Sequence, residues 1–408
     1  RLVVPRSPGP GVKPGSTIEL RMQNALGVFE FVNGEVAMND VSFNFLGAPV
    51  KFPVGGVRVE DSGRFDLSVR DLWVGNLLFN ANLRRIMPDL MAQFALKLDD
   101  GRPFTLRGNL KIGWSGEPGV PAWCEWERTS IILKDNKLKT SIPLEHVNGQ
   151  IKDVRGRSDG SYLEVHGMLD IDSVSVSGLQ ITRLEGPIDV ADGVARLPSV
   201  KASFLGGELY GQGEIAIADS PRYSGALQLN GADLQKYALS ISGRQSFRGL
   251  LNAKADFSGL GTDVRSVNGS GEAHVVEGDI GQLPVVLRFA KGFNNLITPD
   301  APRGKSMFDS ADLVFRIING KTHFDEIKLT GSAVSLKGEG TRDPLDNIDL
   351  KLDILYGRNR YDLPIISQVM REAGGQLVKV RVRGTLAQPV PKVVTVPALS
   401  GLGNRSND

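Results

Sequence analysis

The sequence predicts a mainly β protein built around a long antiparallel sheet, and three observations support this. Apolar and polar residues alternate with a period of two in stretches such as Val334 to Gly340 and Ile348 to Ile354, as side chains do along a strand. Asn-Gly and Asp-Gly pairs, the strongest local signal of a two-residue hairpin, recur along the chain. Glycine makes up 48 of 408 residues, well above the usual ~7%, which fits many turns.

Strand-like runs follow one another along most of the chain. They are residues 28–38, 64–72, 104–114, 161–176, 186–197, 208–218, 223–234, 311–324 and 378–386. The turn pairs between such runs are Asn-Gly at 33–34, 148–149, 230–231, 268–269 and 319–320, and Asp-Gly at 100–101, 159–160 and 192–193. This order predicts a long antiparallel meander.

Three segments depart from the strand period and are predicted to be short packing helices: Asn76 to Leu98, Pro284 to Ile297 and Pro364 to Ala373. Apolar residues in them are three or four positions apart, and proline is favoured in the first turn of a helix. So few helices can cover only part of a sheet.

We expect residues 1–15 to be a linker and 396–408 a tail, because both are rich in Gly, Pro and Ser or polar residues. Residues 16–160 and 161–395 are predicted to form two portions of one continuous β structure. The chain begins with Arg1 and contains no signal peptide, so we interpret it as a fragment whose export signal or membrane anchor lies upstream.

Composition argues against several classes of protein. The net charge is +2, from 48 basic and 46 acidic residues that are interspersed, so nucleic acid is not an expected partner. The lone cysteine, Cys124, excludes an internal disulfide framework and a cysteine-based metal site.

Catalytic motifs are absent. Ser115 lacks the second glycine of G-x-S-x-G, since Glu117 stands at that position, and no Walker or dinucleotide-binding glycine pattern occurs. The histidines have no second ligand at metal-binding spacing; they are His146, His166, His274 and His323. We therefore predict a protein that is not an enzyme and has no cofactor or metal, although paired carboxylates on different strands stay open as an alternative.

Trp114, Trp123 and Trp126 surround Cys124 in the sequence. Two interpretations are open: a packed corner of the sheet, or an aromatic platform of the kind that binds sugars and bases. The packed corner is favoured, because basic residues do not interleave with these aromatics.

Four stretches in the second half of the chain have recognisable features. Residues 204–217 (FLGGELYGQGEIAI) contain a Gly-Gly step between two strands, and residues 247–285 contain a G-x-G strand that leads into a turn and then a helix. Residues 329–354 and 378–393 form a closing pair whose final strand ends in G-x-x-x-x-P. In order and spacing these four stretches resemble the C-terminal region of the AsmA-like family of Gram-negative envelope proteins. Residues 16–160 share only this general pattern, and the tryptophan-rich corner departs from the family pattern.

The resemblance implies a strongly curved antiparallel sheet that forms an open apolar groove. It also implies a non-enzymatic conduit that passes phospholipid between the inner and outer membranes, located in the periplasm and anchored in the inner membrane by a segment upstream of Arg1. Phospholipid is the expected partner; protein partners, lipid species, direction of transport and oligomeric state are not indicated.

In such a groove, alternate strand residues would line the hollow side and contact acyl chains. The predicted lining residues are Ile215, Ile217, Leu227, Leu229, Val334, Leu336, Ile348, Leu350, Leu352, Ile354, Val378, Val380 and Val382. Gly338 and Gly340 lie on the same side and would leave room for close packing or bending.

Two alternatives remain. A structural or adhesive β-protein of the envelope would close the same apolar faces on each other as a core. A carbohydrate-active enzyme on a parallel β-helix is disfavoured by the many hairpin signals, which indicate antiparallel pairing.

Overall fold

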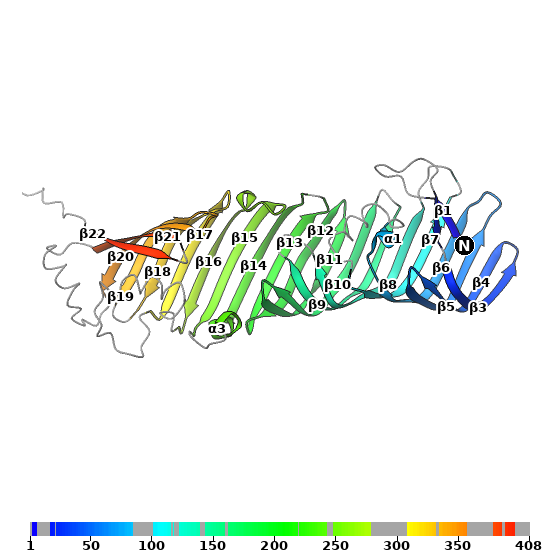
Figure 1. Cartoon of the computed structure of the whole chain (residues 1–408), viewed down its shortest axis with the longest axis horizontal. Helices are drawn as coiled ribbons and strands as arrows, with labels where there is room; N and C mark the ends of the chain where they lie inside the picture. The colour runs from blue at the N-terminus through cyan, green and yellow to red at the C-terminus, as the bar shows by residue number, and fades with distance from the viewer. Residues whose placement is uncertain are drawn as a thin grey trace, which may run out of the picture. The chain divides into compact units, whose positions relative to one another are not determined.

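The computed structural model describes residues 2–5, 17–20, 22–84, 101–115, 117, 122–138, 143–159, 162–218, 220–242, 248–278, 308–331, 334–356, 378–385 and 388–395. Most of these residues lie in strands, which follow one another in Figure 1 with few helices. The prediction of a mainly β, antiparallel fold is confirmed, and the sheet is open.

In chain order, the elements are β1 (Leu2–Pro5), β2 (Thr17–Leu20), β3 (Met22–Val32), β4 (Glu35–Phe45), β5 (Ala48–Val59), β6 (Phe65–Leu77), α1 (Ala81–Arg84), β7 (Phe104–Trp114), β8 (Trp123–Leu138), β9 (Leu144–Ser158), β10 (Leu163–Val176), β11 (Leu179–Ala191), β12 (Val194–Phe204), β13 (Gly207–Ala216), β14 (Arg222–Asp233), α3 (Leu234–Ser242), β15 (Leu250–Leu260), η1 (Val264–Ser266), β16 (Asn268–Val276), β17 (Ser310–Ile318), β18 (Lys321–Thr330), β19 (Val334–Arg342), β20 (Asn347–Tyr356), β21 (Val378–Thr385) and β22 (Pro389–Thr395).

The chain forms two compact units, and each is described by itself. The first contains residues 1–204 and 209–225, and the second contains residues 205–208 and 226–408. In the first unit each strand from β3 to β12 pairs antiparallel with its neighbours in sequence. In the second unit the same holds from β15 to β22.

Two-residue turns with positive φ at both residues join several of these strands, which is the type I′ geometry that suits twisted hairpins. Three predicted turn pairs have it: Asn33-Gly34, Asp192-Gly193 and Asn319-Gly320. Leu46-Gly47 and Leu205-Gly206 form the same turn without Asn or Asp at the first position. These last two could not be recognised by the Asn-Gly or Asp-Gly rule.

Three other Asn-Gly pairs are not hairpin turns, which corrects their interpretation from sequence. The pair at 148–149 lies inside β9, the pair at 230–231 lies inside β14, and the pair at 268–269 begins β16. Gly149 has φ 135°, and a Cβ there would lie 2.5 Å from the carbonyl oxygen of Asp170 on β10. Glycine is therefore needed at 149 because of a close strand approach inside the sheet.

The two units differ in the regularity of their ladders. In the first unit, register shifts interrupt the pairs β3–β4, β6–β7, β7–β8, β8–β9, β9–β10 and β11–β12. In the second unit, among the described residues, shifts occur in β17–β18 and β18–β19 alone. Since a bulge bends its strand and increases the local twist, the first unit has more sites of bending.

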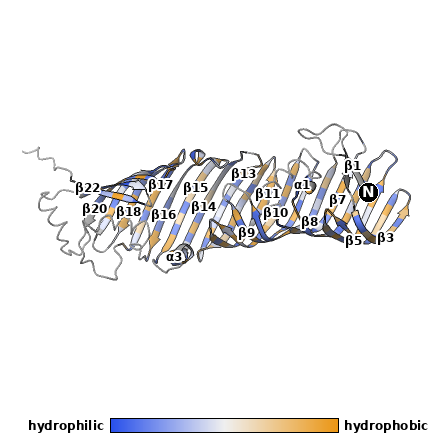
Figure 2. Cartoon of the chain, viewed as in Figure 1, coloured by the Kyte–Doolittle hydropathy of each residue, from blue (hydrophilic) through white to orange (hydrophobic). Residues whose placement is uncertain are grey.

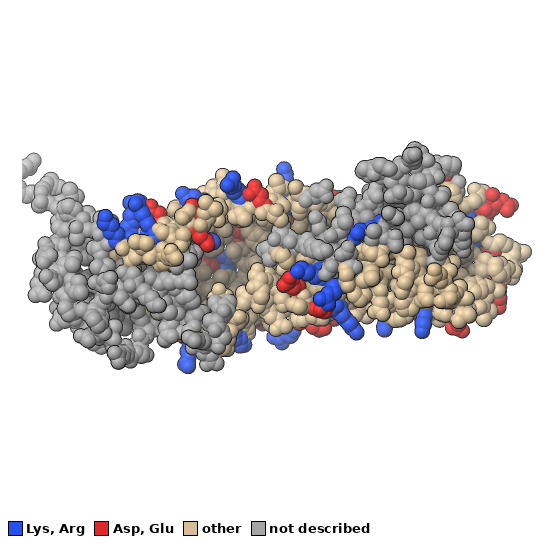
Figure 3. All heavy atoms as spheres, in the orientation of Figure 1, with Lys and Arg blue, Asp and Glu red and all other residues tan. Residues whose placement is uncertain are grey.

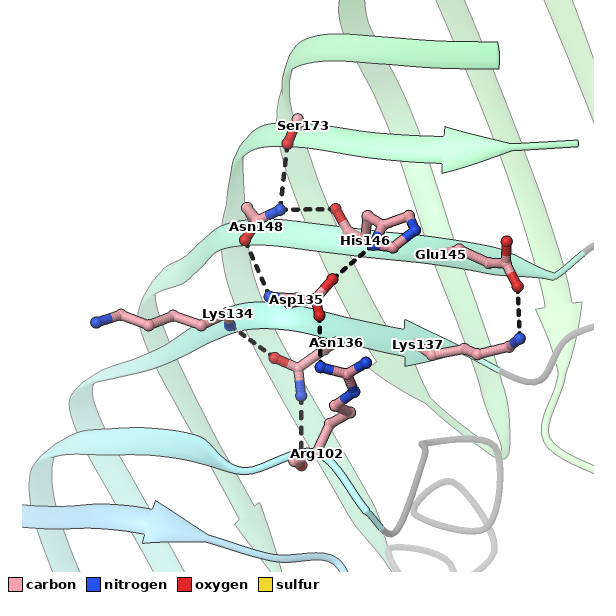
Figure 4. A network of polar contacts seen from close by, with 9 residues as sticks. All are labelled: Arg102, Lys134, Asp135, Asn136, Lys137, Glu145, His146, Asn148 and Ser173. Atoms are coloured by element: carbon pink, nitrogen blue, oxygen red, sulfur yellow. Dashed lines mark hydrogen bonds and ion pairs between the residues drawn. The ribbon is translucent and has the colours of Figure 1, made fainter. Parts of the chain in front are cut away.

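An asparagine side chain on the next strand satisfies the backbone at several irregular positions. The Asn148 Oδ1 atom accepts a hydrogen bond at 2.9 Å from the backbone N–H of Asp135, which has φ 53° (Figure 4). The Nδ2 atom of the same side chain donates to the carbonyl oxygen of His146 at 2.8 Å. The device recurs for the N–H groups of Asp71, Gly231 and Asn319, whose acceptors are Asn109, Asn252 and Asn268.

Asn136 supports the same irregular stretch of β8 from within. Its side chain is 6% exposed, its Oδ1 atom accepts from the N–H of Lys134 at 2.7 Å, and its Nδ2 atom donates to the carbonyl oxygens of Arg102 and Pro103. Figure 4 shows how Arg102, His146 and Asp135 complete this network. A buried amide with these partners costs little to bury and fixes the local path of the strand.

Both α-helices in the described part of the chain are short, and one of them was not predicted. Residues 81–84 form α1 inside the predicted segment 76–98, but residues 76–77 belong to β6 and residues 85–98 lie outside the described residues. The predicted helices at 284–297 and 364–373 also lie outside the described residues. The nine-residue helix α3 was missed, since its sequence LQKYALSIS directly continues a strand pattern.

We predict that Asn148→Ala lowers the free energy of unfolding by about 1–2 kcal/mol, because the N–H of Asp135 loses its acceptor. Amide hydrogen exchange should accelerate at Asp135 more than at other β8 amides. Asn44→Ala, on β4, is the matched control, since no hydrogen bond of the Asn44 side chain is found among the described residues. Equal effects of the two substitutions would contradict this role of Asn148.

Candidate functional site

The candidate site is the apolar face of the sheet, which in the second unit can be followed strand by strand. Directly paired residues on neighbouring strands point to the same side of a sheet. Three rows cross the strands in this way: Leu251, Val275, Ala311, Leu329, Leu336 and Ile354; then Ala253, Ala273, Leu313, Ile327, Gly338, Leu352 and Val380; then Ala255, Gly271, Phe315, Phe324, Gly340, Leu350 and Val382. Every position in these rows is apolar or glycine.

Glycines in these rows make room for the large side chains of the next strand. A Cβ at Gly338 would lie 2.8 Å from Cδ2 of Leu352, and one at Gly340 would lie 2.4 Å from Cδ2 of Leu350. A Cβ at Gly271 would lie 2.6 Å from Cζ of Phe315. The apolar face is therefore made of leucine and phenylalanine side chains that lie across glycine positions.

The opposite face of the same strands is charged. Arg316 on β17 makes two hydrogen bonds of 2.7 Å with Asp325 on β18, and Arg381 on β21 donates to Asp349 on β20 at 2.8 Å. Further cross-strand ion pairs join Lys337 with Glu326, Lys328 with Asp312, and Lys379 with Asp353. Figure 2 shows the resulting alternation of hydropathy along the strands, and Figure 3 shows basic and acidic side chains next to each other.

Exposure varies along the apolar face of the second unit. On β15 and β17 the side chains of Ala253, Leu313 and Phe315 are only half-buried. On β20 and β21 the side chains of Leu350 and Val382 are 5% and 0% exposed. Leu234 and Ala238 of α3 belong to the same buried cluster, together with Phe308.

The structure places the predicted lining residues in different surroundings. One buried cluster contains seven of them: Leu336, Ile348, Leu350, Leu352, Ile354, Val380 and Val382. Two others are half-buried beside Leu163, Val190 and Ala195, namely Ile215 and Ile217. On β14, Leu227 is 42% exposed and Leu229 is half-buried. Val334 and Val378 belong to β19 and β21, but their side chains lie outside the described part of the structure. The assignment of all these residues as lipid lining stays a prediction.

Several residues of the apolar face were not among the predicted lining residues. They are Ala273, Val275, Ala311, Leu313, Phe315, Ile327 and Leu329. The alternation within residues 311–318 would have indicated those of β17. The bulge between β18 and its neighbours hides the same pattern at Phe324 and Ile327, because the period of two is broken between them.

The first unit has an apolar face of the same kind. One row consists of Phe29, Met38, Gly55, Val69, Leu110, Trp126, Gly156, Val165, Val190 and Ala195. A Cβ at Gly156 would lie 2.6 Å from the Trp126 ring, so the indole occupies the space above a glycine. In the second unit leucine and phenylalanine side chains lie over glycines, and in the first unit the Trp126 side chain does the same.

The tryptophans of the predicted corner do not form one cluster. Trp126 pairs with Leu110 on the apolar face, and Trp114 pairs with Phe65 on that face. Trp123 pairs with Gly113 and lies on the opposite, polar face. Of the two interpretations, the packed corner describes Trp126, whereas Trp123 lies on the other face and does not belong to that corner.

Cys124 lies on the apolar face between Ile112 and Ser158. Burial raises the pKa of the Cys124 thiol to about 11, with a smaller opposing effect from a backbone hydrogen bond at Ser158. A thiol with this pKa is almost entirely protonated at neutral pH, and the thiolate is the reactive form. The position is therefore that of a packing residue.

A compact titratable group surrounds His166 on the polar face of the first unit. His166 contacts Asp189 at 2.6 Å and Glu164 at 2.9 Å, and the Tyr162 hydroxyl donates to Glu164 at 2.7 Å. The hydrogen bond with Asp189, and then that with Glu164, raises the pKa of His166. Both imidazole nitrogens are thus engaged, and no cluster suited to a metal ion is present among the described residues.

No helix in the described part of the chain has the length and apolar character needed to cross a membrane.

Comparison with known families decides how this face is interpreted. Residues 134–275, from within β8 to β16, match the sequence model of the AsmA family. Over these residues the chain is similar to the AsmA family. The match includes residues 204–217 of the resembling stretches and part of 247–285, whereas 329–354 and 378–393 lie outside it. Neither the curated proteins nor the solved structures compared with the chain gave a match.

The AsmA family is a family of cell-envelope proteins that are generally not enzymes, and the match suggests a function related to lipid transport in the envelope. The AsmA-like region lies in both units, since it contains residues of β8 to β13 and of β15. The apolar rows described above are thus partly inside and partly outside it.

We predict that Cys124 reacts slowly with a thiol reagent such as 5,5′-dithiobis(2-nitrobenzoic acid) in the folded protein at pH 8. Because the raised pKa keeps the thiol protonated, the reaction rate should keep rising as the pH is increased from 8 towards 10. Unfolding in urea removes the burial and should accelerate the reaction at pH 8. A rate at pH 8 that is the same in folded and unfolded protein would contradict the assignment.

Proposed function

We propose that this AsmA-like protein binds phospholipid acyl chains on the apolar face of its strands and passes phospholipid between the inner and outer membranes. The observation that supports the proposal is the unbroken set of apolar and glycine positions across β15 to β21. The charged face of these strands is suited to contact with water, and the apolar face is suited to contact with acyl chains.

The accessible part of the face is the lipid contact that we propose in the second unit. Side chains such as Ala253, Leu313 and Phe315 are half-buried, so they keep apolar surface that the chain itself does not cover. Burying a methylene is worth about 0.8 kcal/mol, so exposing two acyl chains with roughly 30 methylenes in total to water would cost a free energy on the order of 20 kcal/mol. An apolar surface that accepts them lowers this cost.

Head groups need no dedicated pocket in this proposal. They would stay in solvent while the acyl chains contact the strands, which fits a sheet whose polar face has ion pairs of both signs. Such exposed pairs contribute little energy each, typically under about 1 kcal/mol, but they keep the polar face wet. In this proposal one face of each strand contacts water and the other contacts acyl chains.

The burial of β20 and β21 favours a second candidate at that end of the unit. Val380 and Val382 are 1% and 0% exposed, as expected of a closed protein core. A structural or adhesive envelope protein would have such a core along its whole sheet. The half-buried side chains on β15 and β17 favour the lipid-binding proposal over this alternative.

We predict that a photoreactive p-benzoylphenylalanine at Phe315 cross-links to phospholipid when the protein is expressed in the envelope of a Gram-negative host labelled with radioactive phosphate. The reason is that Phe315 lies on the apolar face of β17. The measurement is the radioactive lipid adduct on the purified chain after irradiation.

The matched control is the same residue at Val314, the next position on β17, which is 39% exposed on the charged face. It should give at most a small fraction of the adduct. Equal labelling at both positions, or none at Phe315 together with no lipid in native mass spectra of the chain, would favour the structural alternative.

A further inference from the structure

A shallow hollow lies on the polar face of the first unit. Its volume is about 400 Å³, and its lining comes from β3 to β8. Its floor is made of small residues that are paired across three neighbouring strands, Ala37, Gly56 and Ser68. A Cβ at Gly56 would meet nothing closer than 3.8 Å, so the space above this residue is unfilled.

One wall of the hollow is the Trp123 indole. Trp123 pairs with Gly113, where a Cβ would lie 2.4 Å from Cζ2 of the ring. The indole therefore rests on the sheet over a glycine, and part of its surface lines the hollow. A tryptophan held in this way presents a rigid aromatic surface at small entropic cost.

Acidic, basic and hydroxyl groups also line the hollow. Arg58 donates to Glu35 at 2.7 Å, and Asp66 lies 3.4 Å from Arg64. Lys111 also lines the hollow, and no partner of its ammonium group is found in the described part of the chain. The Ser68 hydroxyl on the floor can donate and accept.

The balance of these charges indicates the ligand. Arg58 and Lys111 contribute two positive charges, while the carboxylates in the lining are those of Glu30, Glu35 and Asp66. A phosphate or other strong anion would meet these three carboxylates, so a phosphorylated ligand is disfavoured. A neutral ligand with one apolar flat side and many hydroxyl groups suits a hollow that is lined by an indole together with hydrogen-bond donors and acceptors.

We propose that this hollow binds a pyranose unit of an oligosaccharide, with the axial C–H face of the sugar on Trp123 and its hydroxyls towards Ser68, Lys111 and Asp66. The inference is independent of lipid binding, because the hollow is on the other face of the strands. A shallow site of this kind binds weakly, and selectivity rests on the flat ring.

The test is a titration of the full chain, labelled with ¹⁵N at tryptophan, with cellobiose. We expect a saturable shift of the Trp123 indole N–H signal, which Trp123→Ala assigns by its disappearance. Sorbitol, an acyclic polyol with hydroxyls but no ring face, should leave the signal unchanged. Equal shifts with sorbitol, or no shift with cellobiose, would overturn the proposal.

Two variants separate binding from folding. Gly56→Leu should weaken cellobiose binding by at least about tenfold, which corresponds to about 1.4 kcal/mol, because it fills the hollow while Trp123 stays in place. Its Cβ has free space, so the fold should persist. Trp73→Ala is the matched control on the polar face, since the Trp73 ring is already covered by Lys51, whose Nζ lies 5.8 Å from its centroid. Unchanged binding in Gly56→Leu, or the same loss in Trp73→Ala, would contradict the site.

A third arm identifies the source of the sugar. Phosphatidylcholine vesicles with and without a glucosyl lipid are added in place of cellobiose. A shift of the Trp123 signal with cellobiose supports a soluble saccharide chain as the ligand. A shift that appears with glucosyl vesicles alone would overturn that form of the proposal and assign a lipid-borne sugar.

Discussion

The constraint on which the rest of the structure depends is that every strand has one apolar face and one charged face. Strand pairing satisfies the backbone hydrogen bonds of the inner strands, but it does nothing for the apolar side chains, which still need a cover. In the second unit α3 and Phe308 belong to the buried cluster that includes β20 and β21, whereas Ala253, Leu313 and Phe315 remain half-buried. Because this cover is incomplete, these side chains keep accessible apolar surface, and that surface is the basis of the proposed lipid contact.

Local irregularities are accommodated without loss of this two-faced arrangement. Where a bulge inserts a residue, as near Asp135, an asparagine on the next strand accepts the N–H that has left the ladder. Where two large side chains would collide, a glycine takes one of the positions, as Gly338 does beneath Leu352. Polar and apolar residues therefore keep their sides across interruptions that would otherwise exchange them.

Much of the fold could be predicted from the sequence, because a period of two is a direct consequence of strand geometry. Residues 348–354 show it fully, and the structure places Ile348, Leu350, Leu352 and Ile354 together. The pattern could not show whether an Asn-Gly pair turns the chain, as at 33–34, or lies within a strand, as at 148–149. Both uses need a residue without a β-carbon, and the difference depends on the neighbouring strand.

The candidate site was predictable to a smaller extent. Alternation identified the apolar face, but it could not tell an accessible residue such as Phe315 from a covered one such as Val382, since both alternate equally well. Nor did the sequence show that Trp123 and Trp126 lie on opposite faces of β8. Their separation of three residues predicts this only if both lie in one strand, and nothing in the sequence between Trp114 and Trp123 indicates that β8 begins at Trp123.

The pairing of each strand with its neighbours in sequence has a consequence for how the protein forms. Contacts between segments that are close in the chain require little loop closure, and proteins dominated by them fold fast for their size. From β3 to β12, each new hairpin can add to an edge that already exists, as repeat proteins do when structure propagates from one unit to the next. Assembly can thus start before the whole polypeptide is present, and at each stage the newest strand is the edge to which the next strand pairs.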